Sequence, residues 1–486
     1  MIPARQRARL FLAPAYALVL ALLATAPLLA PGYLLLRDAV STPRSYLSDS
    51  ALGLSEAAPR ALPQDFAVAL ATALVDGGEV VKVLLVTGLF LAGWGAARLA
   101  AMVVPEAGLA GQFVAVTIAV WNPYVAERLL QGHWSLIVGY GCLPWVATAM
   151  LQLRTSGASQ WAGVCALVFW IALAGLTPTG LMLAATVAVT CIFAPGSGRP
   201  RWWCAAVGLG AAVLVALPWL AAAAVAVVVP AAMATGPGMA AVEATIRTLP
   251  GLGVVRDAQK WVALAVPVYS LAGAAAVVTV RNRIPAAATA LICCAALIAT
   301  LPDLAWGVGG KMSAVQYPPG WARAAAMINA DPRPVAVLPA DSMRRFAWAG
   351  DTPVLDPLPR WVRADVLTTG DLTIGGRTVP GEGDRARDVQ QLLLTGADRD
   401  KLAAAGVGWV VVENIWNTGW SAPALRLPVA YQDEDVTLYR VGDDHPAASG
   451  RGIMLAAHWL WLGVLMLGGL LAGLLTAWRR RVSIRP

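Results

Sequence analysis

The feature that most constrains this chain is its set of long apolar stretches. A helix needs about 20 mostly apolar residues to cross the hydrocarbon core of a bilayer. We interpret ten stretches of the sequence as such helices, near residues 11–36, 78–99, 108–126, 133–152, 161–176, 178–195, 203–229, 260–280, 285–303 and 452–477. The sequence therefore predicts a polytopic α-helical membrane protein with about ten transmembrane helices.

The composition agrees with this interpretation. Of the 486 residues, 58% are hydrophobic and 13% are charged, whereas a soluble domain carries roughly 25% charged residues. A soluble globular enzyme and a disordered chain are both excluded. The first apolar stretch follows Arg5, Arg7 and Arg9 as a signal peptide would, but it is too long and ends in LLLRD instead of a small-residue cleavage site. We expect it to stay as a membrane anchor.

The charges divide the chain into three parts. Residues 311–450 hold 31 of the 64 charged side chains with a net charge of −3, and the rest of the chain has a net charge of +11. We therefore expect a membrane domain at 1–310 with nine transmembrane helices and a long first external loop at 37–77. A polar domain follows at 311–450, and 451–486 form the last transmembrane helix and a basic tail. Binding to nucleic acid is not expected, because the basic residues do not gather on a polar surface.

The basic residues also predict an orientation. Lys and Arg in short loops mark the cytoplasmic side of a membrane protein. If the N-terminus is cytoplasmic, only one acid, Glu106, falls on that side. The same side then holds thirteen cations: Arg5, Arg7, Arg9, Arg98, Arg154, Arg199, Arg201, Arg281, Arg283, Arg479, Arg480, Arg481 and Arg485. We expect a multi-pass protein of the cell membrane with both termini cytoplasmic and residues 304–450 extracytoplasmic.

The polar domain has the pattern of a small α/β domain. Residues 321–330 and 385–406 read as helices, and 334–340, 407–414 and 436–441 read as strands. Its segment 346–376 is rich in Trp, Pro, Arg and Asp; we favour a long loop pinned by Trp side chains and Asp–Arg pairs over a sugar-binding platform. We find no catalytic motif of a soluble enzyme in this domain.

Ionisable side chains beside membrane spans are functional candidates, because they are costly there. The first group lies in the loop after the first span, with Asp38, Arg44 and an expected interfacial helix at 63–75. The second is WNPYVAERLLQGHW (121–134), where Asn122 and Pro123 are expected to end the third span. Its Glu127, Arg128 and His133 either form a site, or serve only as an ion pair and a helix cap.

The third group lies in TIRTLPGLGVVRDAQKW (245–261), with Arg256, Asp257 and Lys260. Arg256 and Lys260 are four residues apart, so on a helix they share a face and are suited to clamp a phosphate. The alternative is that both cations reach to the lipid headgroups from the end of a span.

The long first loop, the acid in RDAVSTPRSYL and the external polar domain resemble the GT-C superfamily of membrane glycosyltransferases that use polyprenyl-phosphate sugars. WNPYVAERLLQGHW and RDAQKW also resemble segments of uncharacterised multispan proteins from actinobacteria. The resemblance implies a GT-C-like fold and transfer of a sugar from a polyprenyl-phosphate donor to a cell-envelope (cell-wall) glycan or lipid acceptor on the outer face. Its partners would be these substrates and membrane lipids.

The resemblance also implies roles for single residues. Asp38 is at the position of the catalytic base, and Glu127 would be a second catalytic carboxylate or, with Asp38, a ligand of a divalent metal. Arg256 and Lys260 would bind the donor phosphate. Arg44, Arg128, His133 and Asp257 would assist in substrate binding. One departure is that the first loop has no pair of adjacent acids, which leaves open a non-catalytic scaffold or transporter of envelope assembly.

Overall fold

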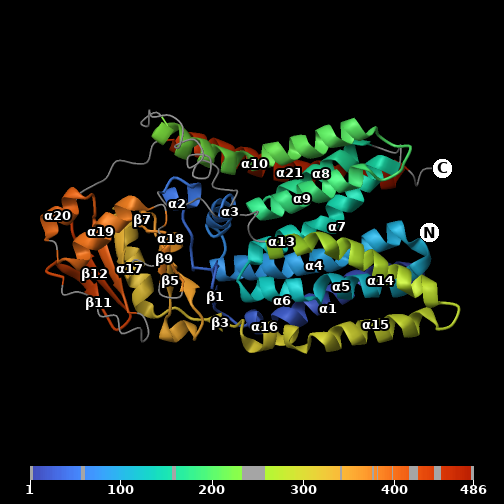
Figure 1. The fold of residues 1–486 in the computed structure, drawn as a ribbon, viewed down its shortest axis with the longest axis horizontal. Coiled ribbons are helices and arrows are strands. Elements are labelled where there is room, and N and C mark those ends of the chain that lie inside the picture. Colours follow the sequence, from blue (N-terminus) through green and yellow to red (C-terminus); the bar gives the residue numbers. More distant parts are fainter. Residues whose placement is uncertain are drawn as a thin grey trace.

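The structure is a computed structural model of the whole chain. It describes residues 4–55, 61–155, 160–231, 258–339, 342–374, 377–379, 381, 383–396, 398–414, 425–442 and 450–482. Figure 1 shows a long helical bundle with the polar domain at one end. The first helix begins and the last helix ends at the opposite end of the bundle.

Each of the ten apolar stretches contains a helix. Among the residues that the structure describes, seven helical segments are long and apolar enough to cross a membrane, and a pair bent by 77° at residues 286–310 would be an eighth. The apolar helices α8 and α9 are shorter than a full span. The helices are α1 (Ala4–Thr25), α4 (Gly77–Val103), α5 (Gly108–Val120), α7 (Trp134–Thr155), α8 (Gln160–Ala174), α9 (Pro178–Ile192), α10 (Arg201–Ala231), α14 (Val266–Val280), α15 (Ala286–Thr300) and α21 (Arg451–Val482). The protein is a multi-pass helical membrane protein, as the sequence predicts.

Helix α4 lies at the centre of the bundle and packs against α1, α5 and α7. Small residues allow the closest of these approaches. A Cβ atom placed on Gly141 of α7 would lie 2.3 Å from the carbonyl oxygen of Gly88 in α4. Small residues at such crossings bring the two backbones together, which favours dispersion contacts in a lipid environment.

The polar domain is built on a sheet with the strand order β11-β12-β10-β4-β7. Strands β4 (Val335–Leu338), β7 (Val366–Leu367) and β10 (Trp409–Glu413) are parallel, whereas β11 (Val429–Gln432) and β12 (Val436–Arg440) are antiparallel to their neighbours. Helices α17 (Pro319–Ala330), α19 (Asp384–Leu394) and α20 (Arg399–Ala404) complete the domain. The helices and strands predicted from the sequence are all present, within a few residues of their expected bounds.

Both faces of this sheet are buried, and successive side chains of a strand pack on opposite faces. Val335 and Val337 pack in one apolar cluster with Trp321 of α17. Ala336 and Leu338 pack in another with residues of α19 and α20. Because side chains of a strand point alternately to opposite faces, a continuous apolar strand is what a sheet covered on both sides requires.

The polar domain is joined to the membrane domain by shared backbone structure. Strand β1 (Tyr33–Leu36), which follows the first helix, pairs with β2 (Ala39–Val40) and also with β3 (Ala314–Val315), where the polar domain begins. Leu35 of β1 is 4% exposed and packs inside the apolar core of the polar domain. The sequence assigned Leu35 to the end of the first span, but the candidate span ends at Leu29, and Leu35 is part of the polar domain's core.

The segment 346–376 is pinned as we expected. Trp361 is buried, and Trp348 packs against Phe346 and Trp321. Arg–Asp pairs hold the same segment; one of them joins Asp371 to Arg387 at 2.9 Å. The segment also contains short elements that the sequence did not reveal, namely β6 (Val354–Leu355), α18 (Leu358–Trp361) and β7.

A buried charge cluster fixes the start of α18. The Arg344 guanidinium lies 2.6 Å from Glu413 and 3.6 Å from Asp356, and all three side chains are buried. Asp356 also accepts a hydrogen bond from the backbone N–H of Leu358 at 2.7 Å. Burial, followed by the charge of Asp356, raises the pKa of Glu413 well above its usual range in spite of Arg344.

The shared core makes a prediction about Leu35. Replacing Leu35 by Ala should weaken docking of the polar domain, because truncating a buried Leu costs about 2–5 kcal/mol. The measurement is the rate of proteolysis between the two domains, together with the thermal midpoint in detergent. Leu29→Ala is the matched control because Leu29 is 58% exposed. Equal stability of the two variants would contradict the shared core.

Candidate functional site

The candidate site is centred on Asp38, in the tight turn between β1 and β2. The preceding residue, Arg37, has a left-handed backbone with φ 51°. The backbone N–H of Asp38 donates to the carbonyl of Gln131 at 3.2 Å, which ties the turn to the segment between α6 (Pro123–Leu130) and α7. The Asp38 side chain is 48% exposed. The carboxylate is therefore accessible while its backbone is held.

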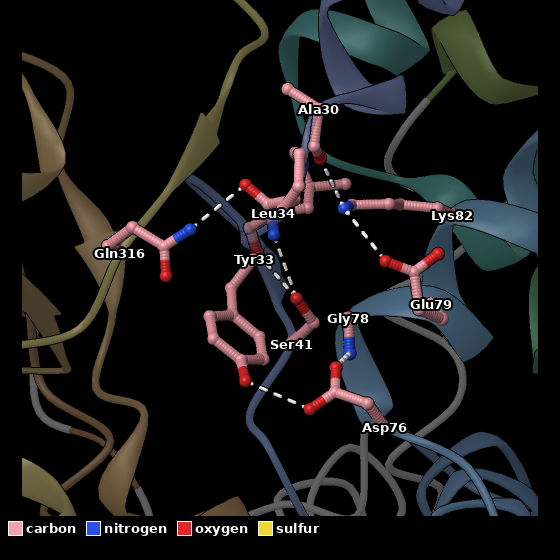
Figure 2. A network of polar contacts seen from close by, with 10 residues as sticks. Ala30, Tyr33, Leu34, Ser41, Asp76, Gly78, Glu79, Lys82 and Gln316 are labelled. Carbon is pink, nitrogen blue, oxygen red and sulfur yellow. Dashed lines mark hydrogen bonds and ion pairs between the residues drawn. The ribbon is translucent and has the colours of Figure 1, made fainter.

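The base of the β1–β2 hairpin is anchored to the start of α4 by the polar network in Figure 2. The buried Lys82 ammonium donates to the Ala30 carbonyl at 2.7 Å and contacts Glu79 at 3.3 Å. The Tyr33 hydroxyl donates to Asp76 at 2.9 Å, and Asp76 in turn caps α4. These bonds satisfy polar groups at the end of the bundle and fix where the hairpin leaves it.

The second predicted group forms the other half of the site. Helix α5 ends at Val120, and α6 starts at Pro123 with Asn122 as its N-cap, whose side chain accepts from the N–H of Val125 at 3.0 Å. The structure confirms the prediction that the helix of the third span ends at Asn122 and Pro123. Beyond α6, Gly132 has φ 74° and lies against the Asp38 turn, so that His133 faces Asp38.

His133 and Arg128 form a hydrogen-bonded chain behind Asp38. The His133 Nε2 atom lies 2.8 Å from Asp38 Oδ2, and Arg128 Nη1 lies 2.9 Å from His133 Nδ1. A guanidinium can only donate, so Nδ1 must accept and the ring proton must be on Nε2. We therefore assign a neutral His133 that donates to the Asp38 carboxylate.

Arg128 is fully buried, at 0% exposure of its side chain. It pairs with Glu127 and lies over the ring of Tyr124 at 5.6 Å. A side chain in this position orients His133 and has no surface to offer a substrate. Glu127 reaches Asp38 only through Arg128 and His133, and both carboxylates already have these partners. No group of three or more His, Cys, Asp or Glu side chains that could hold a metal ion occurs among the residues described, and a metal shared by Asp38 and Glu127 stays a prediction.

Nearby charges hold Asp38 ionised. Burial by itself raises the pKa of Asp38, but the hydrogen bond from His133, together with the charges of Lys260 and Arg360, outweighs it, and the pKa is lowered. Lys260 lies in α13 (Ala258–Trp261). Arg360 comes from α18 of the polar domain. Cations from two separate parts of the chain therefore act on Asp38.

The remaining predicted residues lie elsewhere or outside the described part. Arg44 is exposed and stacks on Tyr46 with 5.0 Å between its guanidinium carbon and the ring centroid; no described contact joins it to Asp38. Arg256 and Asp257 fall outside the described residues.

The sequence did not reveal Arg360 or Gln131, whose side chain accepts from Arg37 at 3.1 Å. Gln131 lay within a segment already singled out, whereas no sequence signal pointed to Arg360.

The close packing of Gly132 predicts a clear effect of substitution. A Cβ atom there would lie 2.2 Å from the Leu36 carbonyl oxygen and 2.4 Å from the Ala39 nitrogen. Gly132→Ala should therefore lower the thermal midpoint and displace His133 from Asp38. Gly108→Ala is the matched control, since Gly108 has φ 57° with nothing within 4 Å and incurs only the backbone strain of about 1 kcal/mol. The predicted contact is wrong if both variants melt alike in detergent.

Comparisons with known proteins support the fold. No family model matches the sequence, and no match is found among curated protein sequences. The structure is similar to two cryo-EM structures of the arabinofuranosyltransferase AftD from Mycobacteria. One has a TM-score of 0.57 and 20% identity over 90% of this chain and 42% of that chain. The other has a TM-score of 0.54 and 17% identity over 88% and 41%. This chain thus spans less than half the length of those proteins. The expected architecture, a multi-pass helical bundle with a small α/β domain, is confirmed, and its fold is similar to that of AftD.

Proposed function

We propose that this protein is a membrane glycosyltransferase that moves a sugar from a polyprenyl-phosphate donor to an envelope glycan or lipid acceptor. The observation that carries the proposal is the half-exposed Asp38, held ionised by His133 at the polar end of a GT-C-like bundle. The similar structures are of an arabinofuranosyltransferase, so polyprenyl-phosphate arabinofuranose is the first donor to test. The reaction would take place on the outer face, because the charge asymmetry of the loops predicts that the polar domain lies on that side.

In the proposed reaction, Asp38 accepts the proton of the acceptor hydroxyl. The hydroxyl oxygen forms a bond to the anomeric carbon, and the bond from that carbon to the phosphate oxygen breaks, with its electron pair staying on the lipid phosphate. A base must be ionised and within hydrogen-bond reach to take the proton, and the lowered pKa of Asp38 meets the first condition. Negative charge that develops on the phosphate must be stabilised by nearby cations. We assign this role to Lys260 and to Arg256, which the sequence predicts as a phosphate-binding residue.

His133 and Arg128 have positioning roles in this proposal. His133 donates to the Asp38 oxygen that does not take the proton, and so orients the carboxylate. Buried Arg128 fixes the tautomer that allows this donation. Glu127 balances the charge of Arg128. None of these steps requires a divalent metal.

Asp38→Asn should abolish sugar transfer while expression and insertion are retained. The amide cannot take the proton, and loss of a general base costs about 100- to 10,000-fold in rate. The assay is transfer from a panel of decaprenyl-phosphate sugars by the protein in lipid nanodiscs. Asp303→Asn is the matched control, because Asp303 is an exposed acid near the same end of the bundle. Transfer by Asp38→Asn at the normal rate would remove Asp38 from the catalytic role.

The pH dependence of transfer should depend on His133. The pKa of Asp38 is lowered in the folded protein, chiefly because His133 outweighs burial, so the base form persists to low pH. In His133→Ala this effect is lost, the pKa of Asp38 rises, and the acid limb of kcat/KM should move to higher pH. The pH profile of kcat/KM reports the free enzyme. An acid limb at the same pH in both proteins would contradict the proposed pairing.

A further inference from the structure

The polar domain is bonded directly to the turn that carries Asp38. The backbone N–H of Arg37 donates to the Pro353 carbonyl at 3.0 Å, and the N–H of Leu355 donates to the Arg37 carbonyl at 2.8 Å. Strand β6 of the polar domain thus brackets the residue next to Asp38. The Tyr317 hydroxyl also donates to the Ser41 carbonyl at 2.9 Å, beyond the β1–β2 hairpin. This domain is part of the framework of the site.

The helix that follows β6 carries Arg360 to the junction of the domains, where α18 lies beside α2 (Asp49–Leu52). Arg360 Nε lies 3.3 Å from Asp65 Oδ1 in α3 (Gln64–Ala71), and the two side chains are 17% and 14% exposed. The charge of Arg360 also acts on Asp38 and lowers the pKa of that carboxyl. Arg360 is therefore anchored by Asp65 and lies on the helix that follows the strand bonded to the Asp38 turn.

The anchoring leaves most of the guanidinium available. Asp65 takes only the Nε donor, and among the contacts of the described residues the Nη1 and Nη2 groups of Arg360 have no partner. Neither atom is fully buried. A planar guanidinium with two adjacent N–H groups free is suited to bind a phosphate in a bidentate manner. The start of α18 is held by the buried Asp356, which limits how far Arg360 can move.

We propose that Arg360 of the polar domain binds a phosphate group beside Asp38, so that the reaction centre is complete only when the two domains are docked. This inference rests on the proposed function and names the group that Arg360 would hold as the phosphate of the polyprenyl lipid. Lys260 of α13, in the membrane domain, is the second cation whose charge acts on Asp38. If the phosphate lies between Arg360 and Lys260, one cation from each domain stabilises the negative charge that develops on it as it leaves the sugar.

The competing explanation is that the Arg360–Asp65 pair only fastens the domains together. The two explanations differ in what the removal of each partner does. If the pair is only a fastener, Arg360→Gln and Asp65→Asn should have the same effect. If Arg360 binds phosphate, Asp65→Asn leaves the cation in place and phosphate binding persists, whereas Arg360→Gln loses it.

The test is binding of sugar-free decaprenyl phosphate to the full chain in neutral-lipid nanodiscs. We expect Arg360→Gln to weaken binding about 10- to 100-fold, the loss of a hydrogen-bonded charge worth about 1.5–3 kcal/mol. Arg360→Lys should restore part of the affinity, because lysine keeps the positive charge but lacks the two adjacent N–H groups of the guanidinium. The double variant Arg360→Gln with Asp65→Asn leaves no unpaired carboxylate, and should bind as weakly as Arg360→Gln alone. Arg363→Gln is the matched control, since Arg363 is exposed and stacks on Tyr46.

Each outcome decides between the explanations. Unchanged binding by Arg360→Gln, or equal losses in Arg360→Gln and Asp65→Asn, would overturn the inference while leaving the transferase proposal intact. Binding that depends on Arg360 in a protein that transfers no sugar would support the phosphate site and count against the proposed function. Competition by inorganic phosphate at millimolar concentration would support a general phosphate site and overturn the assignment to the lipid.

Discussion

The backbone pairing of β1 with β2 and β3 is the constraint on which the site depends. It joins the residues that leave the first helix to the residues that enter the polar domain, more than 270 positions later in the chain. Leu35 then adds a side-chain contact within the polar domain's core. Because both partners are fixed at the end of the same bundle, the turn with Arg37 and Asp38 has little freedom. A carboxylate at the boundary between helices and solvent is in this way given a defined position.

The buried Arg128 is the second constraint, and it is electrostatic. Burying a charged side chain away from water costs free energy unless the side chain has an ion-pair partner and hydrogen bonds. Glu127, the face of Tyr124 and His133 supply those partners. The requirement to satisfy Arg128 thereby determines the proton position on His133, and His133 in turn holds Asp38. The first loop has no adjacent pair of acids, and the structure has an imidazole beside the single acid instead.

The polar domain contributes to the site through its shortest elements. Strand β6 and helix α18 are two and four residues long, and neither has a sequence pattern of its own. They are ordered because the buried Arg344 cluster and the aromatic side chains around Trp321 hold the segment from within. The charge content of the sequence marks the polar domain as a separate unit. In the structure, this domain is bonded directly to the turn that carries Asp38.

The sequence by itself determined the helices, the polar domain and the break at Asn122 and Pro123, and it singled out Asp38 and His133 as candidate residues, which the structure brings into contact. These follow from local rules, namely the length of an apolar stretch, the period of a strand and the conformational limits of proline. Only the tertiary structure decided that Arg128 is buried, that Leu35 belongs to the polar domain, and that Arg360 and Asp65 meet across 295 positions. Such pairings depend on packing and electrostatic complementarity between segments far apart in the chain, and no local pattern of residues records them.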